Sequence, residues 1–550
     1  MKIQRKAVSE RGRNQRGILI TGAGLAAYGI YLVIRIPLSN MLGDTGIGLL
    51  APALEIYFLT TVFFACGLSR TMAGLIRYRM KREQFKSVRR IFRIAFRLAL
   101  FSGIVMAAAF AVFSKMIADI LILEAMSRRA ILVTAPTIVL VALINVFRGY
   151  FSGSGFGVLV AHSHYIEKIS MAAAALFCGE YFYEYGLKVS ALLQNETASY
   201  AYGAMGVMFG VMLSELLTLL YLTFVYGLYG SVRKSQLLQD MDRRLESNGE
   251  IFGMLLQGGL PVAIITLLCN VYLLIDQRFF NYCMNRIEMG EQKTYLWGSY
   301  YGKTVMILGI ATVLVCFSVW EYINRIMAAY EKEEYRMMRD RIGSAVKKLC
   351  VVSFPAAVYV AVLAEVLING LYQGETNQAV SLLRIGAPAI ILYGIAFLFG
   401  QLLLKFHFLR DLFIVILVSF ALHCMVVYLL MHQFVIGAAG VLYSMLVFIA
   451  AFAVLSAFFA IRRLKYRQEW LVSVVFPAFC ACISGLVVML LNRLLLDAAG
   501  EIITVLISCL VGILLYIMLL IIFRVLQEGE LSRLPFGNVW ITLGRMIGVL

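Results

Sequence analysis

The chain is built from repeated apolar runs of about 20 residues, with short polar segments between them. A helix of about 20 residues crosses a hydrocarbon layer about 30 Å thick, so each run has the length of a transmembrane segment. The fourteen predicted spans are 17–40, 47–69, 94–114, 130–151, 157–183, 202–228, 254–280, 296–323, 350–370, 380–404, 411–431, 436–461, 470–492 and 502–523. The sequence therefore predicts an all-α polytopic membrane protein with about 14 transmembrane helices.

The composition supports a membrane protein and argues against two other classes. Of 550 residues, 61% are hydrophobic and 15% are charged, which is too little polarity to cover a soluble protein of this size. The net charge of +18 comes from short basic clusters between apolar runs, a pattern that indicates topology, and no nucleic-acid partner is expected. Most of the ten cysteines lie inside apolar runs, so neither disulfides nor a metal site is expected. Gly206 and Gly210 form a G-x-x-x-G motif, typical of close helix packing.

The basic residues also predict an orientation. Lys and Arg concentrate in alternate loops, chiefly within 70–97, 233–244 and 325–348, which the positive-inside rule places in the cytoplasm. The basic N-terminus precedes an apolar run without a signal-peptide cleavage site before Arg35, so the first helix is expected to be retained. We expect a multi-pass protein of a bacterial plasma membrane with both termini cytoplasmic.

Two short segments of the chain can be aligned with each other. The segment 33–41 can be laid over 274–282 with Arg35 opposite Asp276, which fits two six-helix repeats, a common transporter plan. The expected organisation is an N-terminal lobe of helices 1–6 (1–228), a cytoplasmic inter-lobe linker (229–253), a C-terminal lobe of helices 7–12 (254–465), and two additional helices with a cytoplasmic tail (466–550).

Several ionisable residues lie inside the predicted spans. Such groups are costly in a membrane and are functional hypotheses by default. The basic candidates are Arg35, Arg278 and Lys303, and the carboxylates are Glu55, Glu167, Glu215 and Asp276. In a shared cavity the basic groups suit an anionic substrate such as a phosphate, and the carboxylates would balance their charge or bind a coupling ion or proton. Alternatively, each charge snorkels to an interface or pairs with a neighbour.

Glu167 lies near the middle of its span and needs a partner. Lys168 is adjacent in sequence but about 100° away around a helix, so it is not an obvious partner. Arg148 lies near a cytoplasmic helix end and is expected to snorkel to the interface or to pair with a neighbour. His162 and His164 lie on different faces of a helix, and no metal is expected there. The chain has no nucleotide-binding motif, which favours an ion gradient, the membrane potential or downhill transport, without a cofactor.

Five stretches resemble the polysaccharide-biosynthesis transporters of the multidrug/oligosaccharidyl-lipid/polysaccharide exporter superfamily, in the branch that contains stage V sporulation protein B and lipid II flippases of the MurJ type. The stretches are RIPLSNMLGDTGIGLLAPALEIYFL (35–59), APTIVLVALINVFRGYFSG (135–153), HYIEKI (164–169), YGAMGVMFG (202–210) and GLPVAIITLLCNVYLLID (259–276). The region SGSGFGVLVAHSHYIEK (152–168) departs from the family pattern, so in that span only Glu167 is carried over.

The resemblance implies two six-helix lobes in a V-shaped arrangement plus two extra helices. It implies a flippase, not an enzyme, that moves an undecaprenyl-diphosphate-linked sugar from the inner to the outer leaflet by alternating access. The cationic cavity would contact the diphosphate through Arg35, with Lys303 and Arg278 as equivalents on the second lobe. The expected partners are this lipid-linked anionic glycan and the membrane lipids, and the protein is expected to work as a monomer.

Two alternatives stay open at this point. A multidrug or cation antiporter of the same superfamily would resemble twelve-helix proteins with acidic cavities, whereas this chain has basic candidates. A membrane enzyme of polysaccharide assembly would need a catalytic constellation, and the chain has five histidines and no long outside loop.

Overall fold

The computed structural model describes residues 2–240, 246–532 and 536–546. Within these ranges every regular element is a helix and no strand occurs, so the predicted all-α fold is confirmed. A membrane-spanning helix satisfies its backbone hydrogen bonds within itself, which is why apolar runs of this length fold as helices in lipid. The chain forms two compact units, Met1–Gly302 (unit 1) and Lys303–Leu550 (unit 2).

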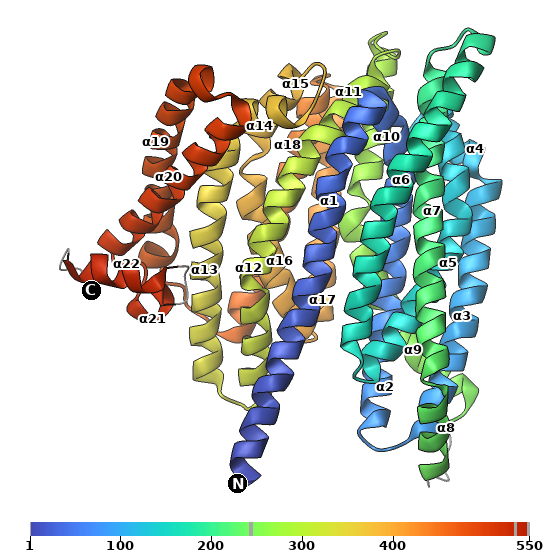
Figure 1. Ribbon diagram of the computed structural model, residues 1–550, viewed down its shortest axis with the longest axis vertical. Helices are drawn as coiled ribbons and strands as arrows, with labels where there is room; N and C mark the ends of the chain where they lie inside the picture. Colours follow the sequence, from blue (N-terminus) through green and yellow to red (C-terminus); the bar gives the residue numbers. More distant parts are fainter. Residues whose placement is uncertain (1, 241–245, 533–535, 547–550) are drawn as a thin grey trace. The chain divides into compact units, whose positions relative to one another are not determined.

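Unit 1 contains the helices from α1 to α11 in Figure 1. Their bounds are α1 (Lys2–Phe63), η1 (Phe64–Ser69), α2 (Arg70–Met80), α3 (Phe85–Val112), α4 (Ser114–Met116), η2 (Ile117–Ile122), η3 (Ala125–Ser127), α5 (Arg128–Gly153), α6 (Gly157–Leu193), α7 (Thr197–Leu228), α8 (Gly230–Gln239), α9 (Asn248–Asn270), α10 (Tyr272–Arg286) and α11 (Lys293–Ser299). A short π-helix, η4 (Tyr300–Thr304), crosses the boundary to unit 2.

Helix α1 turns back on itself at Gly43. This residue has φ 64° and ψ 176°, a backbone conformation that is essentially restricted to glycine. Figure 1 shows the blue chain rising from the N-terminus, turning, and returning towards α2. Arg35 lies on the first arm and Glu55 on the second, roughly two and three helical turns from Gly43. The turn therefore brings these two side chains to the same level of the fold.

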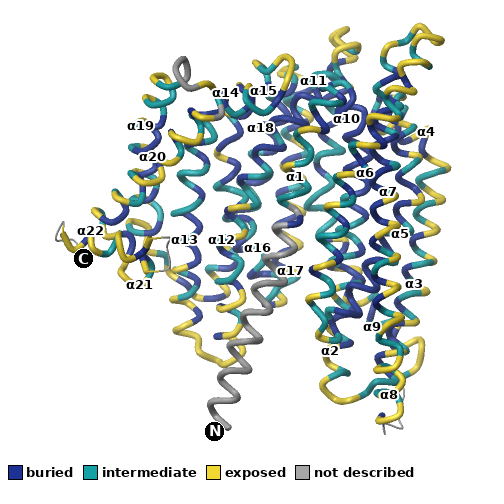
Figure 2. Tube along the Cα trace, in the orientation of Figure 1, coloured by how far each residue is buried: buried dark blue, intermediate teal, exposed yellow. Residues whose placement is uncertain are grey.

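The core of unit 1 is formed by α5, α6 and α7 together with both arms of α1. A Cβ atom on Gly206 would lie 2.4 Å from the carbonyl oxygen of Cys178, and one on Gly210 would lie 2.3 Å from that of Ala174. The G-x-x-x-G motif of α7 thus packs closely against α6, as predicted. Figure 2 shows buried residues along most of α5 and α7 and exposed residues at the helix connections. Phe101 of α3 is 71% exposed, as expected for a residue that faces lipid.

Unit 2 contains the remaining helices. Their bounds are α12 (Val305–Glu331), α13 (Tyr335–Val362), α14 (Ala364–Leu371), α15 (Asn377–Gly386), α16 (Ala389–Lys405), α17 (Leu409–His432), α18 (Ala438–Leu464), η5 (Leu471–Val475), α19 (Phe476–Ala499), α20 (Glu501–Ile522), α21 (Glu528–Leu531) and α22 (Gly537–Met546).

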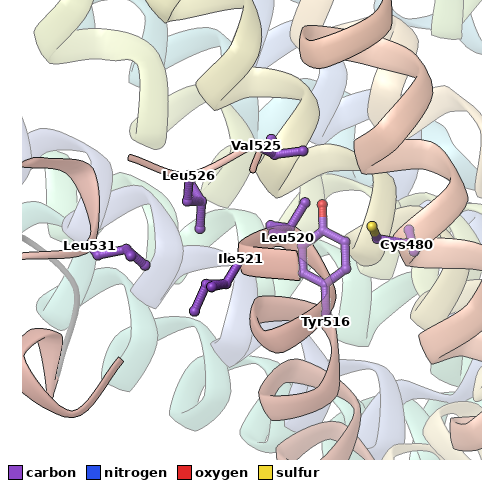
Figure 3. Packing of buried hydrophobic residues seen from close by; sticks show 8 residues of the cluster. Cys480, Tyr516, Leu520, Ile521, Val525, Leu526 and Leu531 are labelled. Carbon is purple, nitrogen blue, oxygen red and sulfur yellow. The ribbon is translucent and has the colours of Figure 1, made fainter. Parts of the chain in front are cut away.

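The last two long helices, α19 and α20, pack together and against α13 and α14. Figure 3 shows the buried apolar cluster that joins them, which includes Cys480, Tyr516 and Leu520. Tyr359 of α13 donates a hydrogen bond of 3.0 Å to Ser484. The Tyr516 hydroxyl donates to the backbone carbonyl of Val351 at 3.0 Å. Both tyrosine hydroxyl groups are therefore hydrogen-bonded within this interface.

Eleven helices in the described residues are long and apolar enough to cross a membrane, or twelve if the bent pair α15 and α16 forms one span. Each of the fourteen predicted spans overlaps a helix. Two features account for the difference between twelve and fourteen: Gly29–Met80 counts as one segment although α1 turns at Gly43, and α6 is not among the helices counted. The protein is a multi-pass membrane protein, and the number fourteen stays a prediction. The division at Gly302 also falls later in the chain than the predicted lobe boundary at 229–253, and the four-segment organisation likewise stays a prediction.

Candidate functional site

Arg35 and Glu55 meet through one aromatic residue in unit 1. The Arg35 guanidinium carbon lies 4.6 Å from the centre of the Tyr301 ring. The hydroxyl of the same tyrosine donates a hydrogen bond of 2.5 Å to Glu55 Oε1. Glu55 is 7% exposed and Tyr301 is 2% exposed. A buried carboxylate is costly unless it is hydrogen-bonded, so the Tyr301 hydroxyl group stabilises Glu55. The face of the Tyr301 ring attracts the Arg35 guanidinium group.

A second aromatic ring links Arg35 to Lys168. Tyr31 lies one helical turn before Arg35 on α1, and the Arg35 guanidinium carbon is 6.0 Å from the ring centre. Lys168 Nζ of α6 lies 4.9 Å from the centre of the same ring. Two cations thus share one π-system, whose negative face attracts both of them. Two positive charges from different helices thus lie within 6.0 Å of the centre of one ring.

Glu167 is the centre of the neighbouring ion-pair network. Arg148 of α5 forms an ion pair with Glu167 Oε2 and donates from Nε to Ser163 Oγ at 3.0 Å. Lys168 Nζ lies 2.5 Å from the other carboxylate oxygen, Oε1. His164 Nδ1 lies 3.8 Å from Oε2. Each oxygen of this buried carboxylate is therefore matched by a cation, the arrangement that makes a buried charge tolerable.

Glu215 of α7 completes the network. Tyr57, on the second arm of α1, donates a hydrogen bond to Glu215 Oε1. Lys168 Nζ lies 5.9 Å from the centre of the Tyr57 ring. The preceding residue on α7, Ser214, donates to the backbone carbonyl of Glu167 at 2.7 Å. Through these contacts α1, α6 and α7 are joined by polar groups at one level of the apolar bundle.

The network contains three cations and three carboxylates. The cations are Arg35, Arg148 and Lys168, and the carboxylates are Glu55, Glu167 and Glu215. Ionised side chains in a membrane protein are costly and mark substrate or ion pathways. An anion that binds to Arg35 and Lys168 would replace part of this internal charge balance. The structure therefore brings together four of the predicted site residues: Arg35, Glu55, Glu167 and Glu215.

Asp276 and Arg278 lie on α10 in a different part of unit 1. The Arg278 guanidinium donates to the backbone carbonyls of Ile120 and Leu121, the latter at 3.2 Å. Asn281 donates to the carbonyl of Ile122 at 2.8 Å. Asp276 has no exposed surface. Arg278 thus binds the carbonyl groups at the C-terminal end of η2, where a cation complements the helix dipole.

Lys303 lies in unit 2 and is 2% exposed. Its ammonium group donates to the backbone carbonyl of Glu375 at 2.9 Å, and the carbonyl of Gln373 lies 3.5 Å away. Both carbonyls belong to the connection between α14 and α15. The ammonium group of Lys303 is therefore hydrogen-bonded within this connection.

Two cations of the network were not predicted as partners of Glu167. The expectation that Lys168 would not pair with Glu167 is wrong, because its long side chain reaches back to the neighbouring carboxylate. Arg148, which was expected to snorkel to the interface or to pair with a neighbour, pairs with Glu167, and its side chain is 7% exposed. Tyr57 and Tyr301 were missed as well. A tyrosine in an apolar run gives no signal of its partner, although its hydroxyl group needs one when buried.

Unit 2 contains a separate cavity of about 520 Å³ between α12, α13 and α20. Its apolar lining includes Val351, Val352, Pro355, Ile513, Ile517 and Leu520. Lys347 also lines it and lies 2.7 Å from Glu530. The cavity is thus mostly apolar, and its lining also contains five charged residues: Glu321, Arg325, Lys347, Lys348 and Glu530.

No family model matches the chain. The fold is that of transporters of the multidrug/oligosaccharidyl-lipid/polysaccharide (MOP) superfamily. The structure of a lipid II flippase MurJ in an inward closed conformation is similar with a TM-score of 0.59 at 14% identity, over 92% of this chain and 98% of that one. An inward-facing multidrug resistance MATE family transporter of the MOP superfamily gives a TM-score of 0.59 at 15% identity, over 80% of this chain and 94% of that one.

In sequence, the chain is similar to stage V sporulation protein B of Bacillus subtilis (strain 168). The two are 20% identical over 537 residues, which is 96% of this chain and 98% of the relative. The similarity therefore extends over both units. Together with the fold, it confirms the resemblance predicted from the five sequence stretches.

Proposed function

We propose that this protein is a flippase that moves an undecaprenyl-diphosphate-linked sugar, such as lipid II or a polysaccharide repeat unit, from the inner to the outer leaflet by alternating access. The observation that carries the proposal is the pair of cations, Arg35 and Lys168, on the Tyr31 ring. A diphosphate needs more than one cation, and arginine matches phosphate oxygens with two parallel donors. The structural similarity to MurJ, a lipid II flippase, supports the same substrate class.

The apolar cavity of unit 2 supports a substrate with a long hydrocarbon chain. Its lining by α13 and α20 is mainly aliphatic, so it suits a polyprenyl tail better than a sugar. The two features together favour a substrate that is both anionic and lipidic.

The carboxylates of the network supply a means of coupling. Substrate phosphate near Lys168 and Arg35 would compete with Glu167 and Glu55 for the same cations. A proton or monovalent cation that neutralises a carboxylate would restore the charge balance, so we infer that transport uses an ion gradient or the membrane potential and no cofactor. We further propose lobes at 1–228 and 254–465, cytoplasmic termini and a functional monomer.

The test is a flipping assay with purified protein in liposomes. Wild type is compared with Arg35→Glu, with Arg35→Lys, and with Arg336→Glu, a charge reversal at an exposed residue of α13. We expect Arg35→Glu to lose about tenfold or more of the flipping rate, Arg35→Lys to retain part of it, and Arg336→Glu to behave as wild type. Equal rates in wild type and Arg35→Glu would exclude the assigned role of Arg35.

The same liposomes distinguish the antiporter alternative. They are loaded with a lipophilic fluorescent cation, and its efflux is followed under a proton or sodium gradient. A flippase of anionic lipids should give no gradient-dependent efflux of the cation. Cation efflux without flipping would establish the multidrug antiporter instead.

A further inference from the structure

A cavity of about 380 Å³ lies at one end of unit 1, away from the charged network. Its lining comes from the end of α2, the start of α3, the ends of α5 and α7, and the short helix α8. Figure 1 shows α2 and α8 at the end of unit 1 opposite to the turn of α1. This end carries the basic segment 70–97 and the linker that begins at residue 229, both predicted to be cytoplasmic.

The cavity is basic. Arg89, Arg233 and Lys234 line it, and none of the described residues in its lining is a carboxylate. The nearby carboxyl groups are engaged elsewhere: Asp240 Oδ2 accepts a hydrogen bond of 2.6 Å from the backbone of Lys86, and Glu246 pairs with Arg79. An anion that enters the cavity therefore meets three cations with no acidic competitor among those lining residues.

Two tyrosines hold one of these cations in position. The Arg233 guanidinium carbon lies 3.4 Å from the centre of the Tyr226 ring, and Nη1 donates to the Tyr226 carbonyl. The same guanidinium group hydrogen-bonds with the hydroxyl of Tyr150. Tyr150 and Tyr226 are themselves in edge contact, with ring centres 5.3 Å apart. A cation held in this way loses little side-chain freedom when it binds a ligand.

The position of the cavity favours a ligand at the membrane surface. Tyr226 lies in the last turn of α7, and Arg233 follows on α8. The chain therefore changes here from the apolar residues of α7 to aromatic and basic residues. That sequence of residue types is typical of the lipid headgroup level. Basic pockets between membrane helices on the cytoplasmic side bind the headgroups of anionic lipids.

We propose that this cavity, lined by Arg89, Arg233, Lys234, Tyr150 and Tyr226, is a binding site for the phosphate group of an anionic phospholipid headgroup. The site is separate from the charged network and does not depend on the proposed flippase activity. A bound headgroup would join α3, α7 and α8, so occupancy should stabilise the full-length protein against unfolding.

The experiment measures the unfolding temperature of the full-length protein in a zwitterionic detergent with three additives. These are a short-chain phosphatidylglycerol, the phosphatidylcholine of the same chain length, and inorganic phosphate at the same concentration. We expect phosphatidylglycerol to raise the unfolding temperature by about 2 °C or more relative to phosphatidylcholine. Inorganic phosphate tests whether the acyl chains are required.

The variant Arg89→Gln/Lys234→Gln removes two exposed cations of the cavity. Its control, Lys81→Gln/Arg82→Gln, removes two exposed cations outside the lining in the neighbouring α2–α3 connection. We expect the first variant to lose at least half of the phosphatidylglycerol shift and the control to keep it. Both variants keep Arg233 and its tyrosine contacts, so neither removes a packed side chain of the cavity.

Each outcome decides one point. A shift with phosphatidylglycerol alone supports a lipid headgroup, and an equal shift with inorganic phosphate supports a phosphate site that a free anion can fill. No shift with either compound overturns the proposal. So does a shift that phosphatidylcholine matches, or one that the cavity variant retains in full.

Discussion

Arg148 on α5 and Glu167 on α6 form an ion pair inside unit 1, with side-chain exposures of 7% and 2%. Lys168 contacts the same carboxylate at 2.5 Å. Removing Glu167 should therefore have a different effect on stability from removing one of its two cations. Loss of the carboxylate leaves both cations without their acidic partner. Loss of Arg148 leaves the carboxylate with Lys168.

The first prediction concerns this asymmetry. Glu167→Met should lower the free energy of unfolding by about 3–5 kcal/mol, the cost of uncompensated buried charge, and Arg148→Met should cost less. Thermal unfolding in detergent measures both, with Glu180→Met at an exposed position of α6 as the control. The reverse order of the first two variants would mean that Lys168 does not support Glu167 as described.

A second prediction concerns the Tyr301 hydroxyl. Tyr301→Phe removes the donor to Glu55 and should cost about 1–3 kcal/mol, because a buried carboxylate then lacks that hydrogen bond. Glu55→Gln in the same background should recover part of the loss, since a neutral amide is less costly to bury than a carboxylate. A double-mutant cycle on unfolding temperatures checks the coupling. Strict additivity of the two substitutions would contradict the hydrogen bond.

The third prediction concerns the contact between α1 and α11. A Cβ atom on Gly298 would lie 1.7 Å from the carbonyl oxygen of Asp44, and one on Gly48 would lie 2.0 Å from that of Thr294. Because backbone atoms cannot yield as a flexible side chain can, Gly298→Ala should destabilise the protein by about 1–3 kcal/mol or more. Gly227→Ala on α7, where nothing lies within 4 Å, should instead be neutral or stabilising by up to about 1 kcal/mol. Similar unfolding temperatures for the two variants would show that the α1–α11 contact is looser than described.

A fourth prediction separates structural from substrate-binding roles for Arg278. Its guanidinium group binds the carbonyls of Ile120 and Leu121, so Arg278→Gln should reduce stability by about 1–2 kcal/mol. The flipping rate per folded protein should stay within about twofold of wild type. A large loss of rate at unchanged stability would instead assign Arg278 to the substrate path.

The sequence predicted the helical class and several charges of the network, because both follow from local patterns. Apolar length gives the helices, and an ionisable residue at membrane depth stands out without any knowledge of its neighbours. Which residue contacts each of these charged groups could not be predicted in the same way. Arg148 and Glu167 are separated by a turn between two helices, and Tyr301 lies 246 positions from the carboxylate it binds. Such contacts depend on how the helices pack.

The interaction of Arg278 with backbone carbonyl groups could not be predicted from the sequence either. Its partners are backbone atoms at the end of a π-helix, and no side-chain pattern marks them. Lys303 shows the same limit, since it donates to the carbonyls of the α14–α15 connection. A cation inside an apolar run of the sequence therefore predicts that a partner exists. It does not predict whether that partner is a ligand or the backbone.

The turn at Gly43 has a consequence for chirality. Its φ of 64° and ψ of 176° are close to the mirror image of an extended L-residue. A D-alanine incorporated at this position would adopt these angles without strain, whereas an L-alanine would not. Nothing beyond the chain neighbours lies within 4 Å of the methyl group of an L-alanine here, so its cost would come from the backbone angles and not from crowding by other elements. The relation between the arms that carry Arg35 and Glu55 therefore depends on one achiral residue, at the point where the chain reverses its direction.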